Sequence, residues 1–214
     1  MELPFTADQF EAVFVAYNQS IWPIQLLAWA LGFVAVLCVK PGRSVRSSRA
    51  VLLILALFWF WTGVAYHINH FTRVNPAAFI FGAAFVAQAA LLVIVALRTE
   101  TIRLQLTRGP RGFIAAALIL YGLVIYPLAA LLGLHVYPAT PMFGTAPCPT
   151  VIFTFGMLLL VRPGPPLWLF LIPTLWAVIG GSAAILLSVP EDWLLLASGA
   201  SWLLVVMPEK PRIP

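Results

Sequence analysis

The chain has 214 residues, of which 62% are hydrophobic and only 9% are charged, with a formal net charge of +5. Soluble domains carry about a quarter charged and about half apolar residues. A water-soluble chain of this length could not bury so much apolar surface, so the composition excludes a soluble protein. It predicts a single membrane domain over residues 1–214, with the lipid bilayer as its main partner.

A short surface helix is predicted before the first long apolar run. Thr6 and Gln9 have the spacing of a capping box, which marks a helix start. From Phe10 onward, apolar residues recur at i, i+3, i+4 and i+7. The pattern predicts an amphipathic helix over residues 5–18 that lies on the outer membrane surface. Residues 1–20 contain no Lys or Arg, so they are not expected to be the start of a cleavable signal peptide.

Seven apolar runs follow, and a helix that crosses about 30 Å of hydrocarbon needs roughly 20 such residues. None of the runs contains Asp, Glu, Lys or Arg in its interior. The fifth and seventh runs are shorter than the others. The predicted fold is therefore all-α, a polytopic membrane helical bundle with seven transmembrane helices. The predicted spans are residues 21–39, 50–66, 77–97, 112–134, 150–161, 167–187 and 193–207.

The basic residues predict the orientation of the bundle, because loops rich in Lys and Arg stay in the cytoplasm. With the N-terminus outside and the C-terminus in the cytoplasm, all basic residues except Arg73 are cytoplasmic. Positive-inside topology thus explains the basic clusters without nucleic acid as a partner. The cytoplasmic residues are Lys40, Arg43, Arg46, Arg49, Arg98, Arg103, Arg108, Arg111, Arg162, Lys210 and Arg212.

Side chains that could bind a metal or a small ligand converge on the predicted outer side. His67, His70 and His135 all fall there, and Cys148 joins them just before the fifth run. The fifth run rises only about 18 Å at about 1.5 Å per residue, so residues 138–149 are expected to dip into the membrane. Non-helical backbone at that depth requires protein or a water-filled cavity around it. We therefore expect an outward-facing cavity lined by His and Cys, with the start of the fifth helix as its floor.

This cavity is a candidate metal, haem or small-ligand site. Pro149 suits the first position of a helix, which predicts Cys148 as the N-cap at the positive end of the helix dipole, where a thiolate is favoured. A thiolate with imidazoles suits zinc or copper, and imidazole also suits haem iron. The candidate ligands are His67, His135 and Cys148, with His70 as a further member.

The structural alternative is that each histidine is an interfacial residue bonded to a loop carbonyl and that Cys148 is a small buried hydrophobe. For His70 this alternative is favoured. Asn75, directly before Pro76, is expected to cap the third helix. Candidates for lining the cavity are Thr62, Asn75, Thr150 and Thr154.

Two functional hypotheses follow. The first is a membrane protein whose outer cavity binds a metal, haem or small ligand from the outer side. The alternative is a small-solute permease or an accessory subunit of a membrane complex, without a metal site. The sequence contains no complete catalytic constellation, so it favours a protein that is not an enzyme. Gln25 and Gln88 are the most prominent polar residues inside the runs, and their simplest role is an interhelical hydrogen bond.

The outer segments also carry a resemblance to a known family. They read WTGVAYH at 61–67, NPAA at 75–78 and PMFGTAPCPT at 141–150. These segments resemble a bacterial family of multi-spanning membrane proteins that is catalogued only as having no known function, and the similarity covers nearly the whole chain. The resemblance implies a location in the bacterial inner (plasma) membrane and implies nothing about activity.

Overall fold

The computed structural model of the chain describes residues 3–39, 44–98, 100–131 and 136–207. Within them the regular secondary structure is helical apart from two short strands, which confirms the predicted all-α class. In chain order the elements are α1 (Ala7–Ser20), α2 (Ile24–Leu37), α3 (Val45–Trp61), η1 (Thr62–Ile68), η2 (Phe71–Arg73), α4 (Ala78–Arg98), β1 (Arg103–Leu104), α5 (Pro110–Leu120), η3 (Tyr121–Ile125), α6 (Tyr126–Leu131), α7 (Pro147–Leu159), β2 (Val161–Arg162), η4 (Leu167–Phe170), α8 (Leu171–Leu186), η5 (Pro190–Asp192), α9 (Trp193–Ser198) and α10 (Leu203–Val206).

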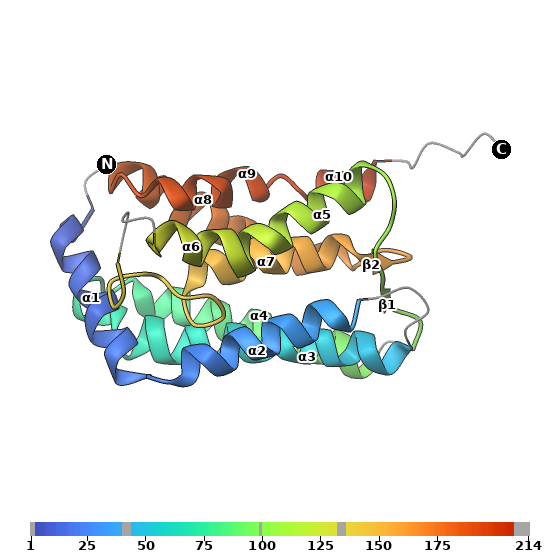
Figure 1. Cartoon of the computed structure of the whole chain (residues 1–214), viewed down its shortest axis with the longest axis horizontal. Coiled ribbons are helices and arrows are strands. Elements are labelled where there is room, and N and C mark those ends of the chain that lie inside the picture. The colour runs from blue at the N-terminus through green and yellow to red at the C-terminus, as the bar shows by residue number, and fades with distance from the viewer. Residues whose placement is uncertain (1–2, 40–43, 99, 132–135, 208–214) are drawn as a thin grey trace.

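The long helices run side by side along the long axis of the molecule, and α7 lies among them (Figure 1). Every residue of α7 is buried, and α3, α5, α8 and α9 pack against it. Two glycines let its backbone approach the α5–η3 segment. A Cβ atom added at Gly156 of α7 would lie 2.9 Å from the carbonyl oxygen of Ala115, and one at Gly122 would lie 2.8 Å from that of Pro149. The core of the bundle is therefore built around α7.

Four helical segments are long and apolar enough to cross a membrane, namely Val45–Arg73, Ala78–Arg98, Pro110–Ala129 and Leu167–Leu186. The pair α1 and α2 also qualifies, but the two are bent by 86°. Large apolar side chains such as Phe113 (76% exposed) and Ile80 (72% exposed) cover the outside, as lipid-facing helices require.

The described residues thus provide four or five candidate spans, where the sequence predicts seven. The difference lies in the shorter runs. The enclosed helix α7 has only 13 residues, and the last apolar run is divided into α9 and α10 by a turn. In the first run, α2 begins only at Ile24, after the bend.

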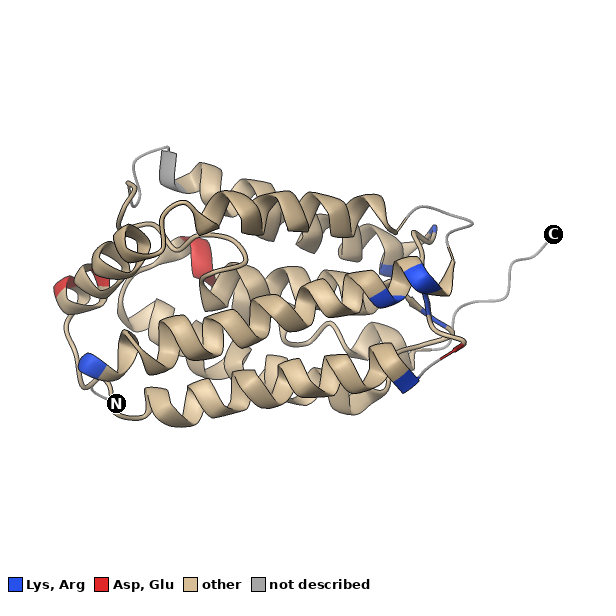
Figure 2. Ribbon diagram, turned by 90° about the horizontal axis from the view of Figure 1, so that it is seen from below, with Lys and Arg blue, Asp and Glu red and all other residues tan. Residues whose placement is uncertain are grey.

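The two ends of the bundle carry opposite charge. Figure 2 shows most of the Lys and Arg residues at one end, whereas the Asp and Glu residues of α1 lie at the other, together with one basic residue. At the basic end, β1 pairs with β2 in antiparallel register, Arg103 opposite Arg162. The sequence predicts only loops there. Arg111 of α5 donates hydrogen bonds to the carbonyl oxygens of Leu159, the last residue of α7, and Val161, the first residue of β2.

The helix α1 lies across the opposite end of the bundle, which agrees with the predicted surface helix (Figure 1). The predicted capping box is confirmed. The backbone N–H of Gln9 donates to the Thr6 hydroxyl, and the Thr6 N–H donates to the Gln9 side chain. The hydroxyl of Tyr17 donates to the carbonyl oxygen of Thr145 over 2.8 Å, and the Asn18 amide donates to two carbonyls of the 136–146 segment. Burial raises the pKa of Tyr17, so its phenol remains a neutral donor that fixes α1 to this segment.

Candidate functional site

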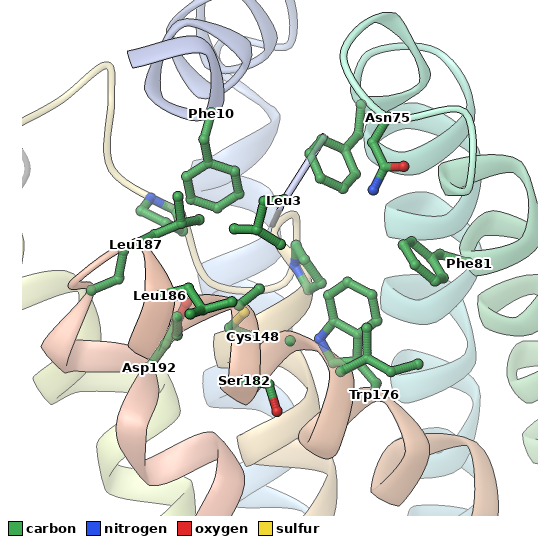
Figure 3. Close-up of a pocket in the computed structure, with 18 of the residues that line it drawn as sticks. Leu3, Phe10, Asn75, Phe81, Cys148, Trp176, Ser182, Leu186, Leu187 and Asp192 are labelled. Carbon is green, nitrogen blue, oxygen red and sulfur yellow. The ribbon is translucent and has the colours of Figure 1, made fainter. Parts of the chain in front are cut away.

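A cavity of about 350 Å³ lies beneath α1, among η2, the start of α4, the start of α7 and the second half of α8 (Figure 3). Small-molecule sites are mostly apolar and occupy about 300–1,000 Å³, so the volume is at the lower end of that range. Most of the lining side chains are aromatic or aliphatic. They include Phe5, Phe10, Phe14, Phe71, Phe81 and Leu186.

An acidic turn forms one wall of this cavity. Asp192 of η5 is 3% exposed and is the only charged side chain among the described residues that line the cavity. The Tyr126 hydroxyl donates a hydrogen bond to its carboxylate. The Tyr121 hydroxyl donates to the carbonyl oxygen of Glu191 over 2.8 Å. The turn is therefore held in place by two tyrosines of the α5–α6 segment.

Trp176 and Asn75 bring hydrogen-bond donors to the cavity. Trp176 of α8 is 7% exposed, its indole N–H points toward Cys148, and no oxygen or nitrogen accepts a hydrogen bond from it. The oxygen of the Asn75 side chain accepts from the backbone N–H of Ala77 over 3.1 Å, so it stabilises the turn that precedes α4, which begins at Ala78. The Asn75 amide nitrogen is turned toward the cavity (Figure 3).

The cavity opens on the side of the bundle. Its roof is closed, since Phe5 and Phe14 are buried. In contrast, Val178, Ile179 and Ser182 of α8 line the cavity and are also exposed on the outer face of that helix. The cavity is therefore reached from the exposed side of α8.

His67 is packed among aromatic rings. It is fully buried, neither ring nitrogen has a hydrogen-bond partner, and it does not line the cavity. Its ring centroid lies 4.6 Å from that of Phe85 and 4.9 Å from that of Trp176. Trp176 thus contacts both His67 and Cys148, two of the predicted ligands. His67 belongs to the π-helical segment η1 (Thr62–Ile68), which directly continues α3.

The other two histidines are placed differently. The Nδ1–H of His70 donates to the carbonyl oxygen of Ala65 over 2.8 Å, a backbone carbonyl that belongs to η1 and not to a loop as its structural alternative predicts. His135 lies outside the described residues. Among the residues that are described, no three His, Cys, Asp or Glu side chains come close enough together to hold a metal ion. A site for zinc, copper or haem that includes His135 stays a prediction, and metal analysis of the purified protein tests it.

The structure corrects the predicted start of the fifth helix. Ala146 is the N-cap of α7 and Pro147 its first residue, so Cys148 lies inside the helix. The prediction of Cys148 as N-cap was wrong because Pro147, like Pro149, suits the first turn of a helix. Cys148 does line the cavity, with Pro147, at the start of α7.

Among the four predicted lining residues, only Asn75 is found in the described lining of the cavity. Thr62, Thr150 and Thr154 are fully buried within the bundle instead. The Thr154 hydroxyl donates to the carbonyl oxygen of Thr150 over 2.8 Å and accepts from the indole of Trp59 over 2.9 Å. The bond from Trp59 joins α3 to α7, whereas the bond to Thr150 lies within α7.

Both buried glutamines make hydrogen bonds between helical elements, as their simplest role predicts. The Gln25 amide donates to the carbonyl oxygen of Asn18, and the Gln88 amide donates to that of Leu169. Neither lines the cavity. A permease or an accessory subunit stays an alternative prediction that these contacts do not test.

Asp192, Tyr126 and Trp176 are not singled out by the sequence. The only sequence feature that points to this part of the site is the acidic pair at residues 191–192. It lies directly before an apolar run, and the charge pattern assigns it to an outer loop. Tyr126 and Asp192 are 66 residues apart, and only the folded bundle brings them together.

The chain belongs to a family of unknown function, DUF6064, whose family model matches residues 7–212. This agrees with the resemblance that the outer segments carry. No curated protein and no solved structure matches the chain.

Proposed function

We propose that this member of a family of unknown function is a multi-pass membrane protein that holds a small amphipathic ligand in the cavity beneath α1. The observation that carries the proposal is the cavity itself. It encloses about 350 Å³ between apolar walls, includes a single carboxylate in its described lining, and opens toward the side of the bundle. An apolar body fits these walls, and a polar head group fits the wall that Asp192 and Trp176 form.

The proposal includes the seven-span topology with α1 outside and the C-terminus in the cytoplasm of a bacterial inner membrane. Support comes from the gathering of Lys and Arg at one end of the bundle (Figure 2). In a variant without Cys38 and Cys148, we expect Asp8→Cys to react with a membrane-impermeant maleimide in intact cells. Arg108→Cys should react only after the membrane is opened. The reverse labelling pattern would contradict this orientation.

A photoreactive probe tests the cavity. The probe is methyl laurate with a diazirine at the end of its chain, added to the purified protein in lipid nanodiscs. We expect crosslinks on cavity residues such as Phe81 and Leu186. Ala183→Trp places an indole on a lining residue of α8, and we expect it to reduce these crosslinks at least about tenfold by excluding the chain.

Ala116→Trp is the matched control, because it adds the same side chain at an exposed position of α5 that does not line the cavity. Its labelling should equal that of the wild type. Crosslinks spread evenly over the lipid-facing helices, unchanged by Ala183→Trp, would refute binding in the cavity.

A further inference from the structure

We propose that the cavity exchanges its ligand with the outer aqueous side through a second mouth, and that α1 is the hinged lid over this mouth. The inference rests on the proposed function, which supplies the ligand, and adds a route to water. It follows from the unequal way in which the two halves of α1 are held to the bundle.

The C-terminal end of α1 is anchored by hydrogen bonds. Tyr17 and Asn18 donate to backbone carbonyls of the 136–146 segment. The Ser20 hydroxyl lies 3.3 Å from Nε2 of His70. Directly after this anchored end, the chain bends by 86° into α2. The end is therefore a fixed point about which the rest of the helix can turn.

The N-terminal half of α1 is held by apolar contacts. Within the described part of the chain, no α1 side chain before Tyr17 makes a hydrogen bond or an ion pair with the rest of the bundle, and α1 packs along no other helix. Ring centroids lie 6.1 Å apart for Phe10 and Phe71 and 4.8 Å apart for Phe14 and Tyr66. Apolar contacts are not directional, so this half can lift without leaving a hydrogen-bonding group unpaired.

The second mouth lies beneath this half of α1. A space of about 50 Å³ adjoins the cavity there, and Phe10, Phe14 and Leu187 line both. Ala7 and Glu11 line the smaller space from α1 and are exposed at the end of the bundle. The ring of Phe10 points from α1 toward the cavity (Figure 3). Lifting the lid would withdraw this ring and join the cavity to the outer surface.

The two mouths face different surroundings. Val178 and Ile179, at the lateral mouth, are exposed apolar residues of the candidate span Leu167–Leu186, so this mouth faces lipid in the proposed topology. Glu11 and Glu191 line the space beneath α1, and carboxylate side chains are costly inside a membrane, so this mouth belongs at the aqueous surface. An amphipathic ligand can therefore enter from lipid through one mouth and leave to water through the other.

The native Cys148 thiol lines the cavity and reports access to it. The protein with Cys38→Ser is placed in lipid nanodiscs and treated with two maleimides of similar size. N-ethylmaleimide crosses lipid and can use either mouth, whereas a maleimide that carries a trimethylammonium group stays in water and can use only the mouth beneath α1. We expect both reagents to modify Cys148, as measured by mass spectrometry of the peptide. Modification by N-ethylmaleimide alone would overturn the second mouth.

Phe10→Ala loosens the lid. It removes a ring that lines both spaces, so we expect it to raise the rate of modification by the cationic maleimide at least about tenfold through a larger open population. Val15→Ala is the matched control, because it shortens an apolar residue of α1 outside the described lining of both spaces. Its rate should stay within about twofold of the starting protein.

A disulfide between the walls of the second mouth locks the lid. Ala7→Cys with Ala139→Cys places thiols on opposite sides of the space beneath α1. We expect oxidation of this pair to slow modification of Cys148 by the cationic maleimide at least about tenfold and to leave the rate with N-ethylmaleimide within about twofold. Ala7→Cys alone, oxidised in the same way, should keep the full rate with both reagents.

The outcomes separate the two proposals. Equal rates of the cationic reagent in the oxidised and reduced pair, or in Phe10→Ala and Val15→Ala, would overturn the lid. Labelling of the cavity by the methyl laurate probe would then leave the proposed function standing. Absence of that labelling would overturn the proposed function, and the exchange of a ligand with it. The comparison of the two maleimides on the protein with Cys38→Ser decides the question even where a further variant does not fold.

Discussion

Replacing Gly156 with alanine is expected to destabilise the bundle by about 3 kcal/mol, at the upper end of the usual range for an overpacked core. A Cβ atom at this position would lie 2.7 Å from a side-chain carbon of Ile119, 2.9 Å from the carbonyl oxygen of Ala115 and 3.0 Å from the backbone nitrogen of Ile119. Two of these three atoms belong to the backbone of α5, so a change of rotamer cannot relieve the contact. The two helices would have to separate.

Thermal unfolding of the purified protein in detergent, followed by circular dichroism, measures the effect. Gly164→Ala is the matched control. A Cβ atom there meets only Val205, at 3.9 Å, which is an ordinary van der Waals distance. We expect the control to change stability by less than about 0.5 kcal/mol. Equal midpoints for the two variants would show that α5 and α7 do not pack this closely.

Removal of the Arg111 guanidinium is the second substitution with a large expected effect. Arg111 is 8% exposed, and it donates to the carbonyl oxygen of Leu159 over 2.7 Å and to that of Val161 over 3.0 Å. Leu159 is the last residue of α7 and Val161 is the first residue of β2, so the guanidinium lies at the C-terminal end of α7, where a positive charge also interacts favourably with the helix dipole. Arg111→Met should cost about 3 kcal/mol, because it leaves both carbonyls without their charged donor.

Arg111→Lys should lose less, since an ammonium group can still bond to one of the carbonyls but lacks the planar fork that reaches both. Arg108→Met is the matched control, because Arg108 is exposed at the same end of the bundle. Its unfolding midpoint should stay close to that of the wild type. If Arg111→Met were as stable as this control, the described contacts would contribute nothing measurable to the end of α7.

These expectations concern contacts that sequence patterns do not reveal. The enclosure of α7 is the clearest case. Its 13 residues appear in the sequence as one more apolar run, shorter than the others. The feature that makes the helix central is that α3, α5, α8 and α9 surround it, and this depends on the packing of four distant segments. Hydrophobicity alone does not distinguish a helix surrounded by protein from one surrounded by lipid.

In the candidate site, too, some residues are predicted from the sequence and others become apparent only in the folded structure. Cys148 and Asn75 are predicted from their positions beside prolines in outer segments, and both line the cavity. Asp192 and Trp176 are not predicted, because an acidic residue before an apolar run and a tryptophan inside one are common features of any membrane protein. The role of each depends on partners at least 28 positions away, with Cys148 contacting both in the folded chain.

The sequence by itself determined the helical class, the membrane-like composition, the charge difference between the two ends, and the local cap at Thr6. Each of these follows from composition or from residues within a few positions of one another, so local propensity and solvation suffice to specify it. The tertiary structure alone decided that α7 is enclosed, that His67 is packed among aromatic rings, and that Tyr126 meets Asp192 at a cavity. Those features require contacts between segments that are distant in the chain, and a pattern read along one segment contains no information about which other segment will cover it.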